Sequence, residues 1–235
     1  GKEDDNYTQQ EISASATALY KPSSLLRFSL AEDLVYSTLA SNIPECPFPR
    51  RYSSVTALAA QYSGRRLKAT ASLTGTLITE TVRTGEAAPD RHHLSPAASI
   101  SYKFAGSANL RIRASYKNSF RVPTFNDLYY MRTGNRNLKP EKAEQVNLGL
   151  TWSGAPENGV VNYARATIDC YYNYVKNKIV ARPTLFIWKM MNLGKVRMAG
   201  VDVSAEARIT AGARQSLVAS GTYSYQYAVD VTDPT

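Results

Sequence analysis

Strict alternation of apolar and polar side chains, kept up over long segments, is the feature that most restricts how this chain can fold. Within 66–79, apolar residues such as Leu67 and Leu73 alternate with polar residues such as Lys68 and Thr70. A period of two places the two sets on opposite faces of a β-strand, whereas a helix would spread the apolar residues around all its sides. The pattern therefore predicts strands with one apolar and one polar face.

The same alternation recurs along the whole chain. It is clear at 110–117, 146–152 and 201–209, and weaker at 10–20, 25–38, 54–62, 95–104, 161–174 and 215–228. It predicts about ten strands of roughly 8 to 15 residues, which is longer than the usual strand. Apolar runs reach only about four residues, far short of the roughly 20 that a membrane-spanning helix needs. If the chain crosses a membrane, it does so as strands.

Short and long connections are expected to alternate between these strands. Short turns containing Gly or Pro are predicted at 21–24, 63–65, 105–108, 153–159 and 211–214, and long polar loops at 39–53, 83–94, 119–141 and 175–197. Five hairpins with short turns on one side and long loops on the other are typical of an antiparallel up-and-down transmembrane β-barrel, with periplasmic turns and extracellular loops. The sequence therefore predicts an all-β fold of this kind over 1–235.

This arrangement assigns each side chain of a strand to the lumen or to the lipid. We expect one lumen-facing set, which consists of Arg66, Lys68, Thr70, Arg111, Arg113, Gln145, Asn147, Asp202, Glu206 and Arg208. The opposite, lipid-facing set includes Leu67, Leu73, Ile112, Leu148, Val203 and Ile209. Lipid-facing positions are then almost free of charge, as the cost of placing charge in hydrocarbon requires. The 16 Tyr residues, against 6 Phe and 2 Trp, suit the aromatic girdles of such a barrel.

Composition argues against several other classes of protein. The net charge of +9 comes from basic residues spread along the chain without a long run, so we do not expect a nucleic-acid partner. Cys46 and Cys170 lie far apart and have no neighbours at metal-ligand spacing. No Ser-His-Asp set, carboxylate pair or phosphate-binding glycine loop stands out, so an enzyme is not expected. Neither a cofactor nor a resident metal is expected.

Two segments resemble the barrel signature of TonB-dependent outer-membrane receptors. The first comprises 116–129 and 134–141, and its motif residues are Phe120, Arg121, Pro123, Asn137, Leu138, Pro140 and Glu141. The second, 191–202, resembles the segment that re-enters the barrel after an extracellular loop. The resemblance implies a plugged barrel of about 22 strands, of which this chain supplies the C-terminal part. We expect a fragment of a longer protein, without a plug domain or a TonB-contact peptide in this piece.

The resemblance also implies a function, namely import of a scarce nutrient across the outer membrane of a Gram-negative cell. TonB would act through the plug region, and a ferric siderophore or cobalamin is the expected cargo. The candidate substrate-binding residues of the long loops are Tyr129, Tyr130, Arg132, Arg136, Arg182, Phe186 and Trp188. Aromatic rings suit a ring-rich ligand, and arginines suit an anionic iron complex. The motif residues have a second interpretation, in which they only fold the loop and brace its return into a strand.

Two further features bear on the cargo. The family's haem receptors carry a histidine between the two halves of the motif, and 124–134 contains none, so haem is disfavoured. His92 and His93 are adjacent in the loop expected at 83–94 and form only a weak candidate for a metal site. The alternative function is a passive outer-membrane pore or an adhesin-type barrel without TonB coupling, which would share the alternation but would not need the motif.

Overall fold

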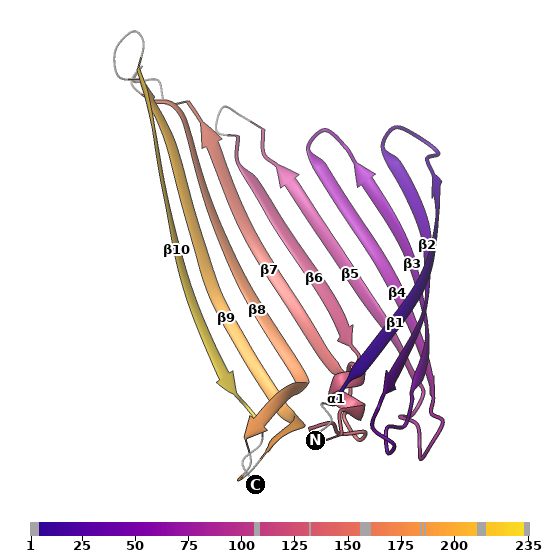
Figure 1. The fold of residues 1–235 in the computed structure, drawn as a ribbon. Helices are drawn as coiled ribbons and strands as arrows, with labels where there is room; N and C mark the ends of the chain where they lie inside the picture. Colours follow the sequence, from indigo (N-terminus) through magenta and orange to yellow (C-terminus); the bar gives the residue numbers. More distant parts are fainter. Residues whose placement is uncertain are drawn as a thin grey trace.

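The structure, a computed structural model, describes residues 5–105, 109–131, 133–155, 161–183, 185, 187–210 and 215–232. These residues form ten strands and one short helix, and the strands build a single antiparallel sheet in which each strand pairs with its neighbours in sequence (Figure 1). The strands are β1 (Tyr7–Tyr20), β2 (Leu26–Ser41), β3 (Arg50–Ser63), β4 (Leu67–Thr81), β5 (Arg91–Lys103), β6 (Arg111–Arg121), β7 (Glu141–Gly154), β8 (Val161–Pro183), β9 (Trp188–Thr210) and β10 (Ser216–Asp230). The predicted all-β, up-and-down architecture is confirmed.

Most of the short connections lie at one end of the sheet and the long ones at the other (Figure 1). We call these the turn end and the loop end. The predicted short turns at 21–24 and 63–65 are confirmed, whereas 211–214 lies outside the described residues, as do parts of 105–108 and 153–159. Long loops at 42–49, 82–90 and 122–140 fall within the predicted ranges, or begin one residue before them, as at 82.

The prediction of a long loop at 175–197 is wrong. Strands β8 and β9 have 23 residues each and continue to pair as far as Pro183 and Trp188, so that only 184–187 connect them. The polar side chains that suggested a loop belong to a hairpin whose backbone groups are satisfied by cross-strand hydrogen bonds. Likewise, β5 begins at Arg91, so His92 and His93 lie in a strand and not in the loop predicted at 83–94.

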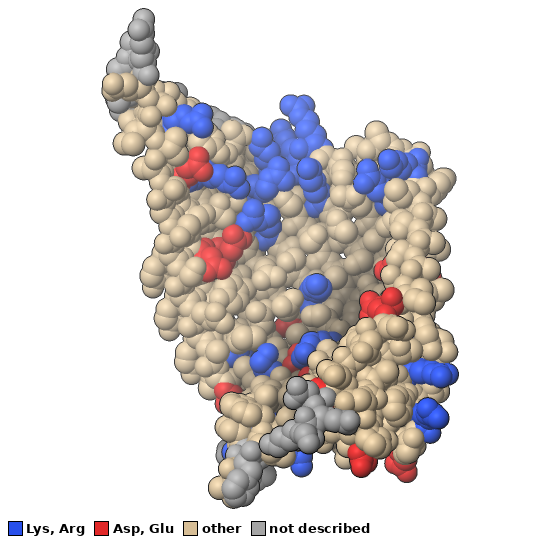
Figure 2. Space-filling view, in the orientation of Figure 1, with Lys and Arg blue, Asp and Glu red and all other residues tan. Residues whose placement is uncertain are grey.

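The register gives the sheet one polar and one apolar face, as predicted. Lys68 pairs with Ser101 on the next strand, and Ser101 pairs in turn with Arg113. The same row of cross-strand partners continues to Asp169 and Asp202. One residue away, an apolar row joins Leu67, Tyr102, Ile112, Leu150, Ile168 and Val203. Because side chains alternate along unbroken β4, Lys68 and Leu73 point to opposite faces. Figure 2 shows Lys and Arg gathered near the turn end of the sheet.

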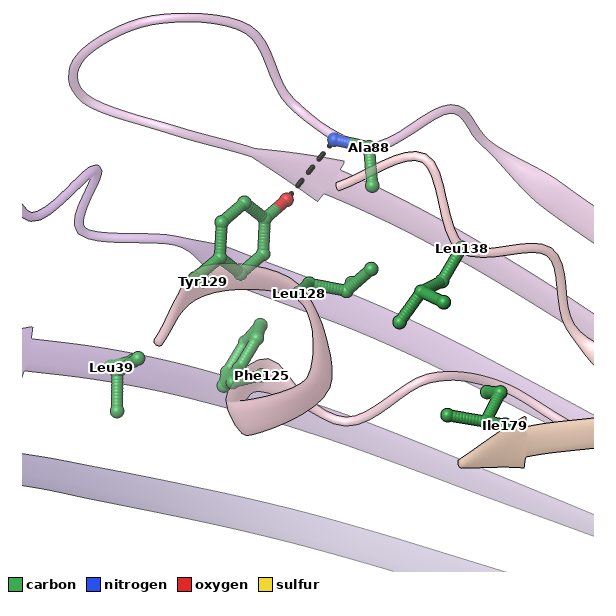
Figure 3. Close-up of a cluster of buried hydrophobic side chains, with 7 residues drawn as sticks. All are labelled: Leu39, Ala88, Phe125, Leu128, Tyr129, Leu138 and Ile179. Carbon is green, nitrogen blue, oxygen red and sulfur yellow. Dashed lines mark hydrogen bonds between the residues drawn. The ribbon is translucent and has the colours of Figure 1, made fainter. Parts of the chain in front are cut away.

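The buried core of the molecule lies at the loop end, where the loop 122–140 folds over the polar face of the sheet. This loop contains the helix α1 (Phe125–Tyr129). The buried cluster consists of Leu39, Ala88, Phe125, Leu128, Tyr129, Leu138 and Ile179 (Figure 3). Among the described residues, no helix is long and apolar enough to cross a membrane.

Candidate functional site

The loop 122–140, which we call the cap, begins with a tightly specified helix start. Thr124 adopts an extended conformation, and its hydroxyl accepts a hydrogen bond from the Asp127 amide at 3.2 Å. In return, the Asp127 carboxylate accepts a hydrogen bond from the Thr124 amide at 2.9 Å. This reciprocal capping box satisfies two amides that the first turn of a helix leaves without partners. The preceding Pro123 is fully buried, which fixes the direction in which the chain enters α1.

A buried ionic cluster joins the cap to the sheet. The Glu80 carboxylate, whose side chain is 0% exposed, accepts hydrogen bonds from Arg51 at 2.8 Å and from Arg91 at 3.0 Å. Its second oxygen accepts a hydrogen bond from the Tyr129 hydroxyl at 2.8 Å. Arg51 also donates to the carbonyl of Pro123 at 2.8 Å. Arg91 donates to the carbonyl of Leu138 at 3.5 Å. The charged residues of β3, β4 and β5 thus hold the cap at three points, which are two backbone carbonyls and the Tyr129 hydroxyl.

Tyr129 stands at the centre of this arrangement and is only 3% exposed. Its hydroxyl donates to Glu80 and accepts from the Ala88 amide at 3.0 Å (Figure 3). Burial, reinforced by the neighbouring Glu80 carboxylate, raises the pKa of Tyr129 to about 12. The phenol therefore keeps its proton and its donor role at neutral pH. Because its side chain packs inside the cap, Tyr129 does not face a substrate, in contrast to the sequence prediction.

The motif residues at the two ends of the cap contact other parts of this chain. One guanidinium nitrogen of Arg121 lies 3.1 Å from a carboxylate oxygen of Glu141, its cross-strand partner. The other terminal nitrogen lies 3.5 Å from a carboxylate oxygen of Asp127. Glu141 in turn accepts a hydrogen bond from the Ile179 amide at 2.6 Å. These contacts close the base of the cap and fix it to β8, which supports the interpretation that they fold the loop.

The remaining motif residues also contact their own chain. Leu138 belongs to the buried cluster, and Phe120 stacks on His93 with ring centroids 4.5 Å apart. The carbonyl of Pro140 accepts a hydrogen bond from Asn177, and the amide of Asn137 donates to the side chain of Asn135. All of these interactions order the cap or the ends of the strands beside it.

Asn192 on β9 provides a second attachment for the cap. Its side-chain amide donates to the carbonyls of Lys139 at 2.9 Å and Asn177 at 2.7 Å, and its side-chain oxygen accepts from the Lys139 amide at 2.8 Å. A backbone hydrogen bond of 2.9 Å from Met190 to Thr133 adds a further link. The cap is thus fixed to the hairpin of β8 and β9 as well as to β3, β4 and β5.

Sequence reasoning did not identify Glu80, Arg51, Arg91 or Asn192 as site residues. Asn192 occurs in the second motif-like segment, but nothing in that segment distinguished it from its neighbours. Glu80, Arg51 and Arg91 continue the polar face of their strands, so alternation gave their orientation. Their convergence on one carboxylate depends on the pairing of three strands and could not be read from any one of them.

Several predicted binding residues remain exposed at the loop end. Tyr130 is 39% exposed and stacks on Tyr7 at 4.3 Å, and Trp188, on β9, is 57% exposed. Arg136 is exposed and donates to the carbonyl of Glu86. Arg182 is exposed near the end of β8. The structure therefore places aromatic and basic groups together at this end of the sheet. Arg132 and Phe186, also predicted, lie outside the described residues.

The two histidines do not form a site together. They occupy consecutive positions of β5, and successive side chains of a strand point to opposite faces. The His93 ring is already engaged by Asn118 at 2.8 Å and by the stacked Phe120. Within the described ranges, no group of three His, Cys, Asp or Glu residues could hold a metal ion.

Comparison with known proteins places this geometry in a family context. Residues 8–235 match the family model described as "TonB dependent receptor-like, beta-barrel". A curated relative, the vitamin B12 transporter BtuB of Vibrio vulnificus, is 30% identical over 94 residues, which are 39% of this chain and 14% of that protein. The matched segment is thus a small part of this relative's length.

Solved structures share the fold. The FrpB iron transporter from Neisseria meningitidis superimposes with a TM-score of 0.70 at 11% identity, covering 94% of this chain and 36% of that one. The copper transporter OprC gives a TM-score of 0.69 at 14% identity, covering 94% of this chain and 38% of that one. The chain therefore spans well under half the length of these transporters.

Proposed function

The chain belongs to the TonB-dependent receptor family, and from this membership we propose that it forms part of the barrel wall of a receptor that imports a scarce, bulky nutrient. In this proposal the barrel lies in the outer membrane of a Gram-negative cell, with the turn end toward the periplasm and the cap toward the outside. TonB supplies the energy by acting on a plug region inside the barrel.

We propose a metal complex, either a ferric siderophore or cobalamin, as the cargo. The observation that supports this class is the exposure of Tyr130, on a cap that buried ion pairs hold in place, and of Trp188 on β9, with basic groups at the same end of the sheet. Exposed aromatic faces suit ring-rich ligands, and a preordered surface binds with a smaller loss of conformational entropy. Arg136 and Arg182 supply positive charge for the carboxylates or catecholates of an anionic chelate.

Binding by the full-length receptor tests this proposal and separates the two cargo classes. The ligands are a ferric catecholate siderophore and cyanocobalamin, measured by isothermal titration in detergent. One variant changes both Arg132 and Arg136 to Ala, a second changes both Tyr130 and Trp188 to Ala, and Lys21→Ala at the turn end is the control. An anionic cargo loses affinity in both double variants, whereas cobalamin loses it chiefly in the aromatic one. Undiminished binding in both would overturn the proposed contacts.

Family membership weighs against the alternative of a passive pore or an adhesin-type barrel. The proteins compared with this chain are named as transporters, which agrees with the expectation that it is not an enzyme. Energy dependence discriminates the two functions directly. Uptake through the receptor should stop when TonB is deleted, whereas uptake through a passive pore should continue.

A further inference from the structure

A pocket with basic walls lies on the polar face of the sheet near the turn end, across strands β5 to β8. Its volume is about 340 Å³, and the residues that line it include Lys103, Arg111, Arg113, Thr151, Ser153 and Arg165. All of these side chains belong to the face that a transmembrane barrel turns toward its lumen. Lys and Arg gather at this end of the sheet (Figure 2). The pocket therefore opens toward the lumen and not toward lipid.

Basic side chains occupy neighbouring cross-strand positions in this pocket. Lys103 lies directly opposite Arg111. On the other side of Lys103, its amide donates to the carbonyl of Arg66 at 2.8 Å, which adds a third cation to the same row. From Arg111 the row continues through the neutral residues Thr151, Thr167 and Ser204. Like charges directly opposite each other destabilise a sheet, and this row contains no carboxylate that would balance them.

The acidic residues nearest the pocket leave two of its cations without a counter-ion. Asp169 is already paired with Arg113, with 2.7 Å between a carboxylate oxygen and a guanidinium nitrogen. Glu206 lies opposite Arg165 in the register. Arg111 donates at 3.0 Å to the hydroxyl of Ser101, which is a neutral group. Among the residues that the structure describes, no ion pair includes Lys103, Arg111 or Arg165. Assigning Glu206 to Arg165 still leaves the charges of Lys103 and Arg111 uncompensated.

A buried hydroxyl in the same row provides an independent indication of a ligand. Thr151 lies opposite Arg111, lines the pocket and is 9% exposed. Within the described part of the chain, its hydroxyl is the one buried side-chain polar atom without a hydrogen-bond partner. Buried polar groups in folded proteins are nearly always hydrogen-bonded, and an exception points to a partner of another kind, such as an ion. An anion held by Lys103 and Arg111 supplies the acceptor that this hydroxyl lacks.

We propose that this pocket binds the dianion of a phosphate group. Its two negative charges match Lys103 and Arg111, and its oxygens can accept hydrogen bonds from an ammonium, a guanidinium and the Thr151 hydroxyl together. A single carboxylate carries one charge and leaves one of the two cations unbalanced. A lipid phosphodiester also carries one charge, and it lies on the other side of the barrel wall. The volume of the pocket admits either free phosphate or the phosphate of a small organic monoester.

Titration of the full-length receptor with inorganic phosphate tests this proposal. Isothermal titration in maltoside detergent at about pH 8, where phosphate is mostly the dianion, uses sodium chloride to hold the ionic strength constant. Acetate, a monoanion, should bind at least tenfold more weakly than phosphate. Lys103→Gln and Arg111→Gln should each weaken phosphate binding at least tenfold. Arg27→Gln, an exposed change on the same face but outside the pocket, is the control and should bind like the wild type. Glycerol 3-phosphate, titrated in parallel, shows whether the free ion or the monoester binds more tightly.

Thermal unfolding distinguishes a ligand site from a cluster with a merely structural role. Without phosphate, Lys103→Gln should raise the melting temperature, because the substitution removes a pair of like charges. With phosphate the order should reverse, because the ligand stabilises the folded wild type and not the variant. Thr151→Val keeps the shape of the side chain. It should weaken phosphate binding severalfold without lowering the melting temperature in the absence of phosphate, since the hydroxyl has no hydrogen bond to lose.

Three results would overturn the proposal. The first is a folded wild-type receptor that binds no phosphate, in which case carboxylates from another part of the receptor balance the row. The second is equal affinity for acetate and phosphate, which would mean that the pocket does not select a dianion. The third is unchanged phosphate binding in both Lys103→Gln and Arg111→Gln, which would place the ion elsewhere on the protein.

Discussion

The hydroxyl of Tyr129 donates a hydrogen bond of 2.8 Å to the carboxylate of Glu80, which joins the helix of the cap to strand β4. Through Glu80 the same contact reaches Arg51 and Arg91, so that one buried carboxylate connects three strands and the cap. The exposed residues proposed to meet cargo lie on or beside this fixed element.

Removing the charge of Glu80 should release the cap. Glu80→Gln leaves Arg51 and Arg91 buried without a counter-ion, and breaking a buried ion pair in this way typically costs about 3–5 kcal/mol. We expect rapid tryptic cleavage within 122–140 in the folded receptor. Glu86→Gln, an exposed change in a neighbouring loop, is the matched control and should be cleaved like the wild type. Equal protection of the Glu80 variant would show that the ions do not hold the cap.

Tyr129 should titrate far later than an ordinary tyrosine. Its pKa of about 12, against the ordinary 10.0, means that the folded state favours the protonated phenol. The stabilisation is fully present below about pH 10 and is lost as the pH rises toward 12. The measurement is a pH titration of phenolate absorbance in the wild type and in Tyr129→Phe. The difference between the two curves reports the ionisation of Tyr129 and should be centred near pH 12. A difference centred near pH 10 would contradict the buried hydrogen bond, and Tyr130→Phe is the exposed control.

Loss of the Asn192 side chain should loosen the cap on its other side. Asn192→Ala removes three hydrogen bonds to Lys139 and Asn177, and leaving such a donor unsatisfied costs about 1–3 kcal/mol. Amide exchange of Lys139 should accelerate about tenfold or more in hydrogen-exchange mass spectrometry. Asn162→Ala, which removes the contact to Thr210 at the turn end, should leave the cap unaffected. Unchanged exchange at Lys139 would mean that this attachment is dispensable.

The two faces of β4 should respond oppositely to added charge. Leu73→Lys places an ammonium on the lipid side and should lower the unfolding free energy by about 2–4 kcal/mol near the membrane centre. Ser72→Lys, one residue away, faces the lumen and should be nearly neutral. Urea unfolding in phospholipid vesicles measures both. Similar losses in the two variants would contradict the assigned register.

Alternation along the sequence was sufficient to predict most of the architecture. The face of the sheet on which Lys68 or Leu73 lies follows from the local sequence alone, because a strand has a fixed period of two. Strand ends were less predictable, as the hairpin of β8 and β9 shows, because polar residues suit an extended hairpin outside the membrane as well as a loop. The motif resemblance located the cap correctly, but only the structure showed that Tyr129 is buried.

The sequence by itself determined the strands, their two faces, the turn and loop ends, and the resemblance to the receptor family, since each depends on residues close together along the chain. Tertiary structure decided which distant residues meet. Glu80 gathers Arg51, Arg91 and Tyr129 from separate elements, and Glu32 meets Ser54 and Thr56 only through the register of β2 and β3. The physical reason is that pairing between strands, and the folding of the cap onto them, brings together side chains that carry no local signal of each other.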